Sequence, residues 1–294
     1  MTTALAEEFE THRPRLFGLA YRMLGSAQEA EDTVQDAYLR FGTADRAAIE
    51  HVGAWLAKVT TNLCLNRLTS ARARRERYVG TWLPEPVLTA DGTLGPLETA
   101  EQRDAVSLAL LVLLERLTPT ERAVYVLRTG FAYGHAEIAG VLDLTEANSR
   151  QLYRRAERRI AEEKARFEPD AGRRDALLTA FLAAARGGDL AGLEKLLAAD
   201  VTWWGDGGGK ASAAVRPVLG REKVARFVAG VFRLHLAGAT FTVVELNGAP
   251  GLLILDGDTL VGTVGVVCRE GVVSEVRAVL NPDKLAFVRR QLAG

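Results

Sequence analysis

The chain has 294 residues, a length that predicts two or three domains, each able to bury its own hydrophobic core. It carries 37 basic and 37 acidic side chains, so its formal net charge at neutral pH is zero. The charges are nevertheless unevenly distributed along the chain. The first fifty residues are acidic on balance, while residues 58–77 and 150–166 are basic. A basic domain that binds nucleic acid can therefore lie inside a neutral protein.

The composition also excludes several classes of protein. Cys64 and Cys268 lack the spacing of a metal site, and we expect both to be buried small hydrophobes in a reducing cytosol. The N-terminal segment has early acidic residues and no long apolar stretch, so we expect no secretory signal there. No apolar run approaches the roughly 20 residues that cross a bilayer. We expect a soluble, cytoplasmic protein that uses no membrane, metal or cofactor.

Two helices are predicted at the start of the chain. An apolar stripe over residues 16–24 ends at Gly25, and Ser26 can then cap a second helix together with Glu29. One face of the second helix is apolar around Val34. The opposite face carries Asp32, Gln35, Asp36 and Arg40. From the residues alone, that polar face is equally well interpreted as a solvated surface or as a docking surface for a partner helix or coil.

A third helix is predicted from His51 to about Val79, with an apolar side followed by a run of basic residues that begins at Arg67. Basic side chains after an amphipathic start suit contacts with backbone phosphates. Trp55 and Asn62 could add stacking and hydrogen bonds to the bases of an unpaired strand. Trp55 fits a core position equally well.

Residues 80–99 contain three prolines and three glycines and have no sustained hydrophobic period, so a linker is predicted there. Trp82 and Leu83 are unusual in a merely solvated linker. Part of this segment is therefore expected to pack against a domain.

Residues 117–160 have the pattern of a helix-turn-helix: helices over 119–128 and 135–142, a tight turn at 143–144 and a long basic helix from Glu146. Thr118 and Glu121 predict a capping box. A helix in the major groove reads base edges near its N-terminus and neutralises phosphates further along. The candidates are Asn148, Ser149 and Arg150 for bases, and Arg154, Arg155, Arg158 and Arg159 for phosphates. The alternative is a solvated face whose arginines pair with neighbouring glutamates.

The remaining residues predict an α+β domain, with helices first and a strand meander after them. Helices are expected over 175–185, 190–197 and 221–234, a short strand over 201–204, and four more strands over 240–246, 252–256, 259–268 and 272–280. The whole chain is therefore expected to be multidomain, with two all-α domains followed by a cone in which a curved antiparallel sheet wraps around helices.

Residues 10–165 resemble a sigma-70 family factor of the extracytoplasmic-function type. The matching text is AEDTVQDAYLRF in the core-polymerase-binding helix, AWLAKVTTNLCLNRL in the minus-10 segment, and LTPTERAVYVLR with HAEIAGVLDL in the minus-35-binding domain. The resemblance implies region 2, a helical bundle, at 1–79, a linker at 80–104, region 4 at 105–166 and a second linker at 167–173. Asn66 and Thr69 depart from the acid and base that such factors commonly carry there.

The resemblance also assigns roles to particular residues. It implies that Asp32, Gln35, Asp36 and Arg40 face the beta-prime clamp helices of bacterial core RNA polymerase. Trp55, Lys58, Asn62 and Arg67 would lie along the minus-10 strand of promoter DNA, and Asn148, Ser149, Arg150, Arg154 and Arg155 would read the minus-35 element. Such a factor is not an enzyme; it supplies promoter choice and strand opening to the polymerase.

Residues 174–294 are similar to a SnoaL-like, nuclear-transport-factor-2-like cone. The phrases WLPEP, DGGGK and NPDKL resemble those of sigma factors with such an extension, the SigJ-like group. In that group the cone is thought to regulate the factor in cis, which implies regulatory roles for Trp82, Asp206, Gly207, Gly208, Gly209, Lys210, Asn281, Pro282 and Asp283. The glycines form no Walker motif, and we interpret them as a flexible turn that lets Lys210 reach an acidic partner.

A cone of this kind has a pocket, so a second class of function remains open. Trp203, Trp204, Asp206, His235 and Asp256 could line it and hold a small-molecule ligand. The alternatives to a sigma factor are a cyclase or isomerase fused to a DNA-binding module, and a ligand-responsive repressor. The polar face of the second helix favours a sigma factor, because a repressor has no use for a polymerase-docking helix.

Overall fold

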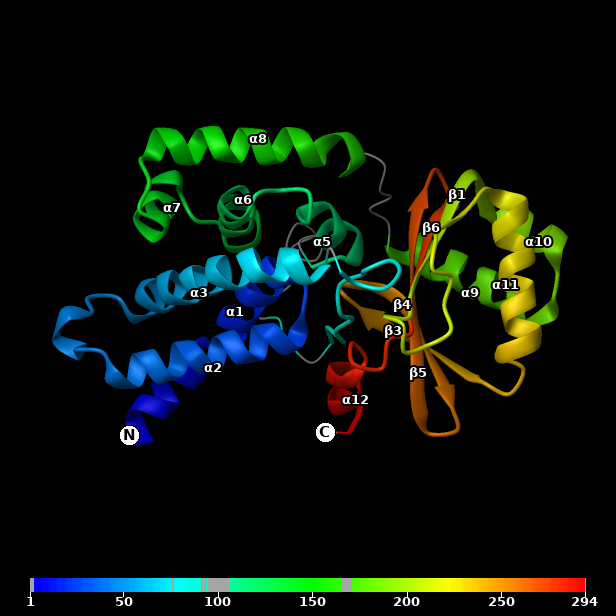
Figure 1. Ribbon diagram of the computed structural model, residues 1–294, viewed down its shortest axis with the longest axis horizontal. Helices are drawn as coiled ribbons and strands as arrows, with labels where there is room; N and C mark the ends of the chain where they lie inside the picture. The colour runs from blue at the N-terminus through cyan, green and yellow to red at the C-terminus, as the bar shows by residue number, and fades with distance from the viewer. Residues whose placement is uncertain are drawn as a thin grey trace. The chain divides into compact units, whose positions relative to one another are not determined.

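The computed structural model describes residues 3–75, 77–90, 92, 94, 106–164 and 171–293. The chain forms two compact units: residues 1–76 with 89–162, and residues 77–88 with 163–294. In the described ranges the first unit is built of helices, and every strand lies in the second (Figure 1). The segment 77–88, which the sequence marks mostly as linker, thus belongs by its contacts to the C-terminal unit.

Three long helices begin the first unit. They are α1 (Thr3–Leu24), α2 (Ala27–Thr43) and α3 (Val52–Arg75), with a short 3-10 turn η1 (Arg46–Ala48) between the last two. Ser26 caps α2 as predicted, because its Oγ accepts a hydrogen bond from the Glu29 backbone N–H at 3.1 Å. The third helix ends at Arg75, earlier than the expected Val79. Large buried side chains on these helices, among them Tyr21 and Phe41, form one shared core.

The helix-turn-helix pattern is present in the second half of this unit. Its helices are α5 (Leu108–Leu114), α6 (Pro119–Phe131), α7 (His135–Leu142) and α8 (Glu146–Lys164). The capping box of Thr118 and Glu121 forms as predicted at the start of α6. Asp143 ends α7 in the left-handed region, with φ of 53°, which gives the tight turn before α8.

A buried arginine that the sequence analysis did not single out joins α6 to α1. Arg122 is 3% exposed, and its Nη1 donates to the Met23 carbonyl at 2.9 Å and to Glu115 Oε1 at 2.8 Å. Burial lowers the pKa of Arg122 to about 10, so the guanidinium remains charged at neutral pH. Arg75 of α3 also pairs with Glu115. The Glu115 carboxylate therefore links α3 of the predicted region 2 to α6 of the predicted region 4.

The second unit is a mixed sheet covered by helices. Its described helices are α9 (Ala171–Gly187), α10 (Leu190–Leu196), α11 (Arg221–His235) and α12 (Ala286–Ala293). The strands run in the order β2-β1-β6-β5-β4-β3. Their bounds are β1 Leu197–Asp206, β2 Val218–Leu219, β3 Thr240–Leu246, β4 Ala249–Asp256, β5 Thr259–Arg269 and β6 Val272–Val279.

The predicted α+β fold is confirmed, and the sheet is antiparallel at every pair of strands except β1 and β6, which pair in parallel and make the sheet mixed. After β1 the chain crosses by way of α11 to the far edge of the sheet. The four alternating strands β3 to β6 then return and place β6 beside β1 with the same direction. The meander itself was predicted correctly.

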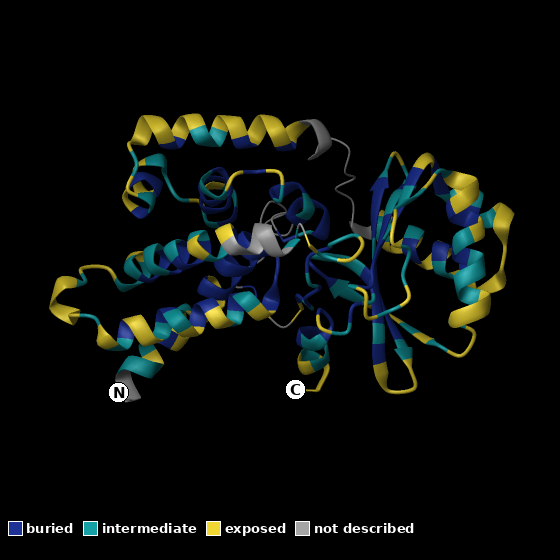
Figure 2. Ribbon diagram, viewed as in Figure 1, coloured by how far each residue is buried: buried dark blue, intermediate teal, exposed yellow. Residues whose placement is uncertain are grey.

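The core of the cone lies between the sheet and α9, α10 and α11, which cover one face (Figures 1 and 2). Phe181, Leu193 and Val224 contribute from the three helices, and Val276 contributes from the central part of the sheet. Cys268 is buried in this core and Cys64 in the helical unit, as expected for small hydrophobes.

Candidate nucleic-acid interface and linker site

The polar face of α2 lies on the surface. Asp32, Gln35 and Arg40 are exposed, whereas Ala30, Val34, Ala37 and Phe41 of the same helix are buried. Asp36 is partly buried, and its Oδ2 lies 2.6 Å from Nη2 of Arg67 on α3. One predicted polymerase-binding residue therefore orients one predicted DNA-binding residue.

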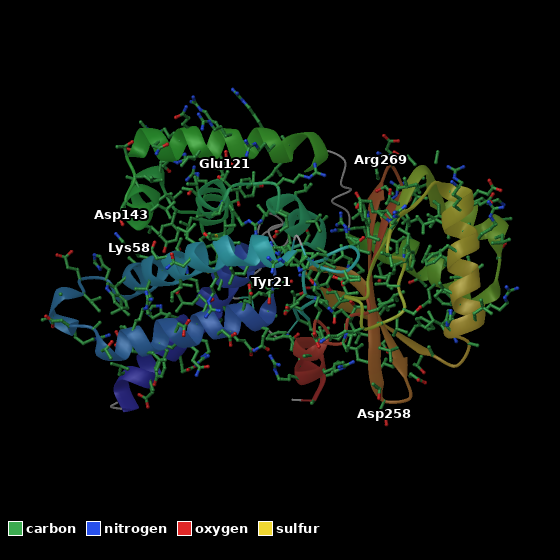
Figure 3. The ribbon with its side chains drawn as sticks, in the orientation of Figure 1. Tyr21, Lys58, Glu121, Asp143, Asp258 and Arg269 are labelled. Atoms are coloured by element: carbon green, nitrogen blue, oxygen red, sulfur yellow. The ribbon has the colours of Figure 1, made fainter. Side chains whose placement is uncertain are left out.

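Helix α3 carries the residues expected at the minus-10 strand. Trp55 is half-buried, and its ring is tilted against Phe41 with 6.0 Å between centroids, while Asn62 is half-buried as well. Lys58 is engaged by the helix-turn-helix: its Nζ lies 2.9 Å from the Gly140 carbonyl and 2.6 Å from Asp143 Oδ1. Figure 3 shows Lys58 and Asp143 side by side. The Lys58 ammonium therefore uses two of its three N–H donors in contacts within the protein.

The basic face of α8 is open along most of its length. Asn148, Arg150, Arg154 and Arg155 are exposed, and Arg150 also pairs with Glu146 one turn earlier. Arg159 instead reaches back to the buried Glu121, with 2.6 Å from Nη1 to Oε2. The exposed residues near the start of the helix have the donors that base edges require.

The expectation that Ser149 faces DNA is corrected by the structure. Ser149 is fully buried, and its Oγ lies 3.0 Å from Nδ1 of His135 at the start of α7. The sequence contains a signal for this, because Ser149 precedes Leu152 and Ala156 at the helical spacing of the buried face. Burial, together with Arg128 and Arg150, lowers the pKa of His135, which favours the neutral ring.

The DGGGK and NPDKL motifs meet the linker at one site in the second unit. We call Tyr78, Leu83, Asp206, Asn281 and Lys284 the linker site. Asp206, at the end of β1, is fully buried. Its carboxylate accepts three hydrogen bonds: from Tyr78 Oη at 2.5 Å, the Leu83 N–H at 2.8 Å and Lys284 Nζ at 2.6 Å. Asn281 Nδ2 donates to Tyr78 Oη at 2.7 Å.

Lys284 completes the linker site from the other motif. It is 5% exposed, it donates to the Leu83 carbonyl, and its Nζ lies 4.3 Å from the Trp82 ring centroid and 4.7 Å from that of Tyr78. An ammonium over two aromatic faces gains cation–π attraction in addition to its ion pair. Burial, and then the hydrogen bond with Asp206, raises the pKa of Tyr78, so its hydroxyl remains a proton donor at neutral pH.

The glycines of DGGGK let side chains of the linker site approach the backbone of the turn closely. Gly208 has a φ of +58°, and a Cβ there would lie 2.2 Å from Asn281 Nδ2 and 2.7 Å from Tyr78 Oη. Beyond the turn, Lys210 Nζ reaches Asp283 Oδ2 at 2.5 Å on the exposed surface. The predicted acidic partner of Lys210 is thus Asp283. Pro282 between these groups is half-buried, and its carbonyl accepts from Arg289 at 3.4 Å.

The linker has a second attachment further along. The backbone N–H of Val87 donates to Asn247 Oδ1 at 3.1 Å, and the Asn247 N–H donates to the Val87 carbonyl at 2.9 Å. Leu88 exchanges two hydrogen bonds of 2.9 Å with the Gln291 side chain. The sequence indicated packing at Trp82 and Leu83, but it gave no local sign of Tyr78, Asn247 or Gln291, whose partners are distant in the chain.

The cone contains a pocket of about 520 Å³ between α11 and the sheet. Trp203, His235 and Asp256 line it as expected. Trp204 and Asp206 are not among its described lining residues. Side chains alternate along β1, so Trp204 lies on the opposite side from Trp203, and Asp206 is held in the linker site instead.

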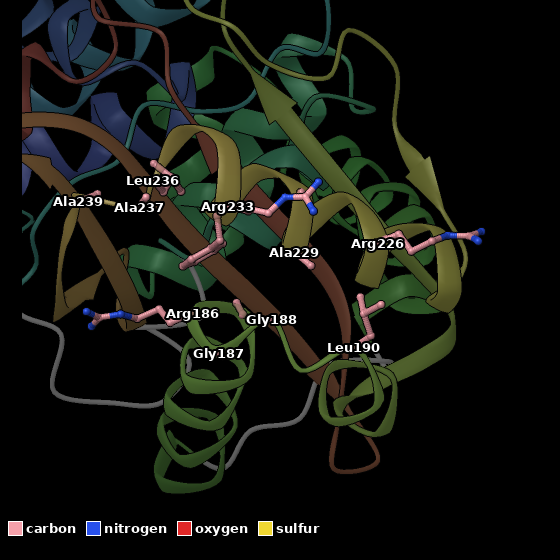
Figure 4. Close-up of a pocket in the computed structure, with 13 residues that line it drawn as sticks. Arg186, Gly187, Gly188, Leu190, Arg226, Ala229, Arg233, Leu236, Ala237 and Ala239 are labelled. Carbon is pink, nitrogen blue, oxygen red and sulfur yellow. The ribbon is translucent and has the colours of Figure 1, made fainter.

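A second hollow of about 670 Å³ lies beside the first and contains Arg186, Arg226 and Arg233. Figure 4 shows their guanidinium groups pointing away from one another. Arg226 pairs with Glu222, and Arg186 lies over the Phe241 ring. Diverging cations do not surround a single anion, so this hollow is not a candidate phosphate site.

The described residues show neither a cluster of metal ligands nor a helix that could span a membrane. In the part of the chain that the structure describes, no group of three or more His, Cys, Asp or Glu side chains is placed to hold a metal ion. Among the same residues, no helix combines the length and apolar character needed to cross a bilayer.

Three family models match the chain. Sigma-70 region 2 matches residues 9–74, Sigma-70, region 4 matches 107–160, and the SnoaL-like domain matches 178–281. The ECF RNA polymerase sigma factor SigJ of Mycobacterium tuberculosis is 38% identical, over 94% of this chain and 92% of its own length. The probable ECF sigma factor SigI of that organism is 30% identical, over 97% and 96% of the two chains. The crystal structure of the M. tuberculosis SigJ matches with a TM-score of 0.76 and 36% identity, covering 96% of this chain and 98% of that one.

Proposed function

We propose that this chain, which belongs to the ECF RNA polymerase sigma factors of the sigma-70 family, binds core polymerase through the polar face of α2. As a sigma factor it directs promoter-specific transcription initiation in the compartment where the polymerase works, the cytoplasm. The exposure of Asp32, Gln35 and Arg40 supports this docking role. An exposed row of polar groups remains hydrated in the free protein. The same groups can form hydrogen bonds and ion pairs with a partner helix on binding.

Promoter reading is assigned to two surfaces of the helical unit. The exposed N-terminal part of α8 supports base contacts from Asn148 and Arg150 in the minus-35 element, with Arg154 and Arg155 on phosphates. Trp55, Lys58, Asn62 and Arg67 of α3 would follow the minus-10 strand. The Asp143 carboxylate would then compete with DNA phosphates for the Lys58 ammonium, so the free protein holds part of its proposed DNA-binding surface in internal contacts.

Regulation in cis is assigned to the linker site. The observation that carries this proposal is the fully buried Asp206 carboxylate, which holds both the side chain of Tyr78 and the backbone of Leu83. Because residues 77–88 follow region 2 along the chain and precede region 4, fixing them to the cone limits where the two sigma regions can go. Trp82, Gly207–Gly209, Lys210 and Asn281–Asp283 would support the same contact.

The two other classes of function have less support. The matched relatives are sigma factors, and the cone's His235 and Asp256 are exposed residues rather than a buried acid and base pair. A repressor would bind DNA without polymerase. Retention on core polymerase therefore discriminates the sigma factor from both alternatives.

The docking role is tested by charge reversal. We expect Asp32→Arg to weaken binding of the full chain to purified core polymerase, because it reverses a charge at the centre of the exposed face proposed to contact the partner. Asp258→Arg, the same change at the exposed β4–β5 hairpin (Figure 3), is the control and should bind like the unaltered chain. Equal affinities for all three proteins would contradict docking through α2.

A further inference from the structure

The outward face of α2 has a residue spacing that suits packing against another helix. Four exposed residues follow one another at intervals of four, three and four residues: Gln28, Asp32, Gln35 and Leu39. This alternation is the seam spacing of a coiled coil, in which successive seam residues meet the partner helix. The buried residues of the same helix, among them Val34, lie on the opposite face (Figure 2). We call the four exposed residues the α2 seam.

Leu39 differs from the other residues of the α2 seam because it is apolar. Its side chain is 57% exposed. In the described part of the helical unit, it is the only large hydrophobic residue that is exposed. A leucine at a seam position is the residue type that packs between the side chains of a partner helix. Its burial there would remove from water apolar surface that the free chain leaves exposed.

The two polar residues nearest to Leu39 on the seam are available to a partner. Among the described residues, neither Asp32 nor Gln35 has a side-chain hydrogen bond or ion pair. Asp36, at the flank of the seam, is by contrast held by Arg67 at 2.6 Å. Polar residues at seam positions fix the register of helix packing through hydrogen bonds to the partner. The α2 seam thus combines one apolar position with two free polar positions.

The charge of α2 discriminates between possible occupants of the seam. The helix carries four carboxylates and one guanidinium group: Glu29, Glu31, Asp32, Asp36 and Arg40. A second copy of this chain would place a like-charged helix against it, and like charges across an interface are unfavourable. A helix of another protein with neutral or basic side chains complements this charge. The α2 seam therefore favours a partner protein over self-association.

We propose that Leu39 is the apolar anchor of the polymerase-docking face, and that the α2 seam packs along a helix or coiled coil of core polymerase. Leu39 enters a hole between apolar side chains of that partner, while Asp32 and Gln35 set the register. This inference rests on the proposed docking role of α2, and it adds a residue and a packing geometry to that role. Burial of apolar area at Leu39 then contributes affinity that the charged residues do not supply.

The test measures the Kd of the full chain for purified core polymerase. Leu39→Ala keeps a strong helix former but removes most of the apolar side chain, whereas Leu39→Met retains its size and apolar character. We expect binding at least about tenfold weaker for Leu39→Ala and within about threefold of the unaltered chain for Leu39→Met. The matched control is Leu234→Ala on α11, where the side chain is 68% exposed. It should bind like the unaltered chain.

Salt dependence separates an apolar anchor from an effect of charge. Raising the NaCl concentration from about 0.1 M to about 0.5 M screens exposed charges but does not weaken apolar burial. The ratio of the Kd of Leu39→Ala to that of the unaltered chain should therefore stay constant within about twofold. The same ratio for Asp32→Arg should fall by at least about threefold, because its repulsion or lost attraction is screened.

Two results would overturn the inference while leaving the docking role of α2 or the sigma function intact. If Asp32→Arg weakens core binding and Leu39→Ala does not, α2 docks through its polar groups without an apolar anchor. If the unaltered chain dimerises in sedimentation velocity, and Leu39→Ala is monomeric with unchanged core binding, the seam belongs to a second copy. Failure of the unaltered chain to bind core polymerase would instead overturn the proposed function, and this inference with it.

Discussion

The Asp206 carboxylate is the residue-scale feature on which the hold of the linker depends. It has no exposure to solvent, and its Lys284 partner has a side chain that is 7% exposed. A buried ion pair adds little to the free energy of unfolding compared with well-packed apolar side chains in its place. Removing one partner, however, leaves the other charged and without solvent. The Lys210–Asp283 pair from the same two motifs is 56% and 65% exposed, so solvent screens it.

Asp206→Ala is therefore expected to lower the free energy of unfolding of the C-terminal unit by about 3–5 kcal/mol. Asp283→Ala, the exposed control, should cost no more than about 1 kcal/mol. Urea denaturation followed by tryptophan fluorescence measures both. Adding Lys284→Met to Asp206→Ala should recover part of the loss, because the unpaired ammonium is removed. Equal costs for the two single variants would contradict the assignment of Asp206 as the buried anchor.

Ser149 and Arg150 are neighbours in sequence with different expected roles. Ser149→Ala removes a buried hydrogen bond to His135 and should cost about 1 kcal/mol of stability without altering base preference. Arg150→Ala should weaken binding to the cognate minus-35 element by about 1–3 kcal/mol while stability is retained. Binding assays on cognate and scrambled duplexes separate the two effects. An equal loss on both duplexes for Arg150→Ala would indicate a phosphate contact instead.

At the scale of elements, helices were easier to predict than the faces they present. Caps at Ser26 and Thr118 are local signals, and both form. The minus-35 face was misjudged at Ser149, because a polar side chain on the buried face of α8 is satisfied by His135, a partner fourteen residues away that periodicity does not reveal. Buried polar groups are the residues that a hydrophobic pattern places least well.

The contact between α3 and α7 predicts a restraint on DNA binding by the free protein. Asp143→Asn keeps a residue that tolerates the left-handed turn but removes the charge that pairs with Lys58. Exposed ion pairs contribute up to about 1 kcal/mol, so we expect promoter affinity of the free chain to rise by up to about fivefold. Fluorescence anisotropy with a labelled promoter duplex measures this.

The control for that experiment is Glu157→Gln, which removes the same charge from the exposed part of α8 without touching Lys58. A smaller gain for Glu157→Gln than for Asp143→Asn is expected. The same gain for both variants would mean that only the net charge matters and that the Lys58–Asp143 pair imposes no restraint.

For the whole molecule, the order of domains followed from motifs, whereas long-range pairing did not. The meander and its turns were predictable because strand period and glycine positions are local. The parallel β1–β6 pair and the attachment of residues 77–88 depend on segments separated by much of the chain, and no local pattern encodes their partners. In the linker site, the DGGGK and NPDKL motifs predicted Asp206 and Asn281, but no motif predicted Tyr78.

These features describe a sigma factor whose SnoaL-like domain holds residues 77–88 through a few buried polar groups, and the proposed role of that domain is regulation in cis. Run-off transcription with purified core polymerase and a candidate promoter tests this claim most directly. The proteins to compare are the unaltered chain, Arg150→Ala, Tyr78→Phe and the control Tyr38→Phe. We predict a promoter-dependent transcript from the unaltered chain and from Tyr38→Phe, a reduced yield from Arg150→Ala, and a changed yield from Tyr78→Phe. Failure of the unaltered chain to bind core polymerase, or equal yields from all four proteins, would contradict it.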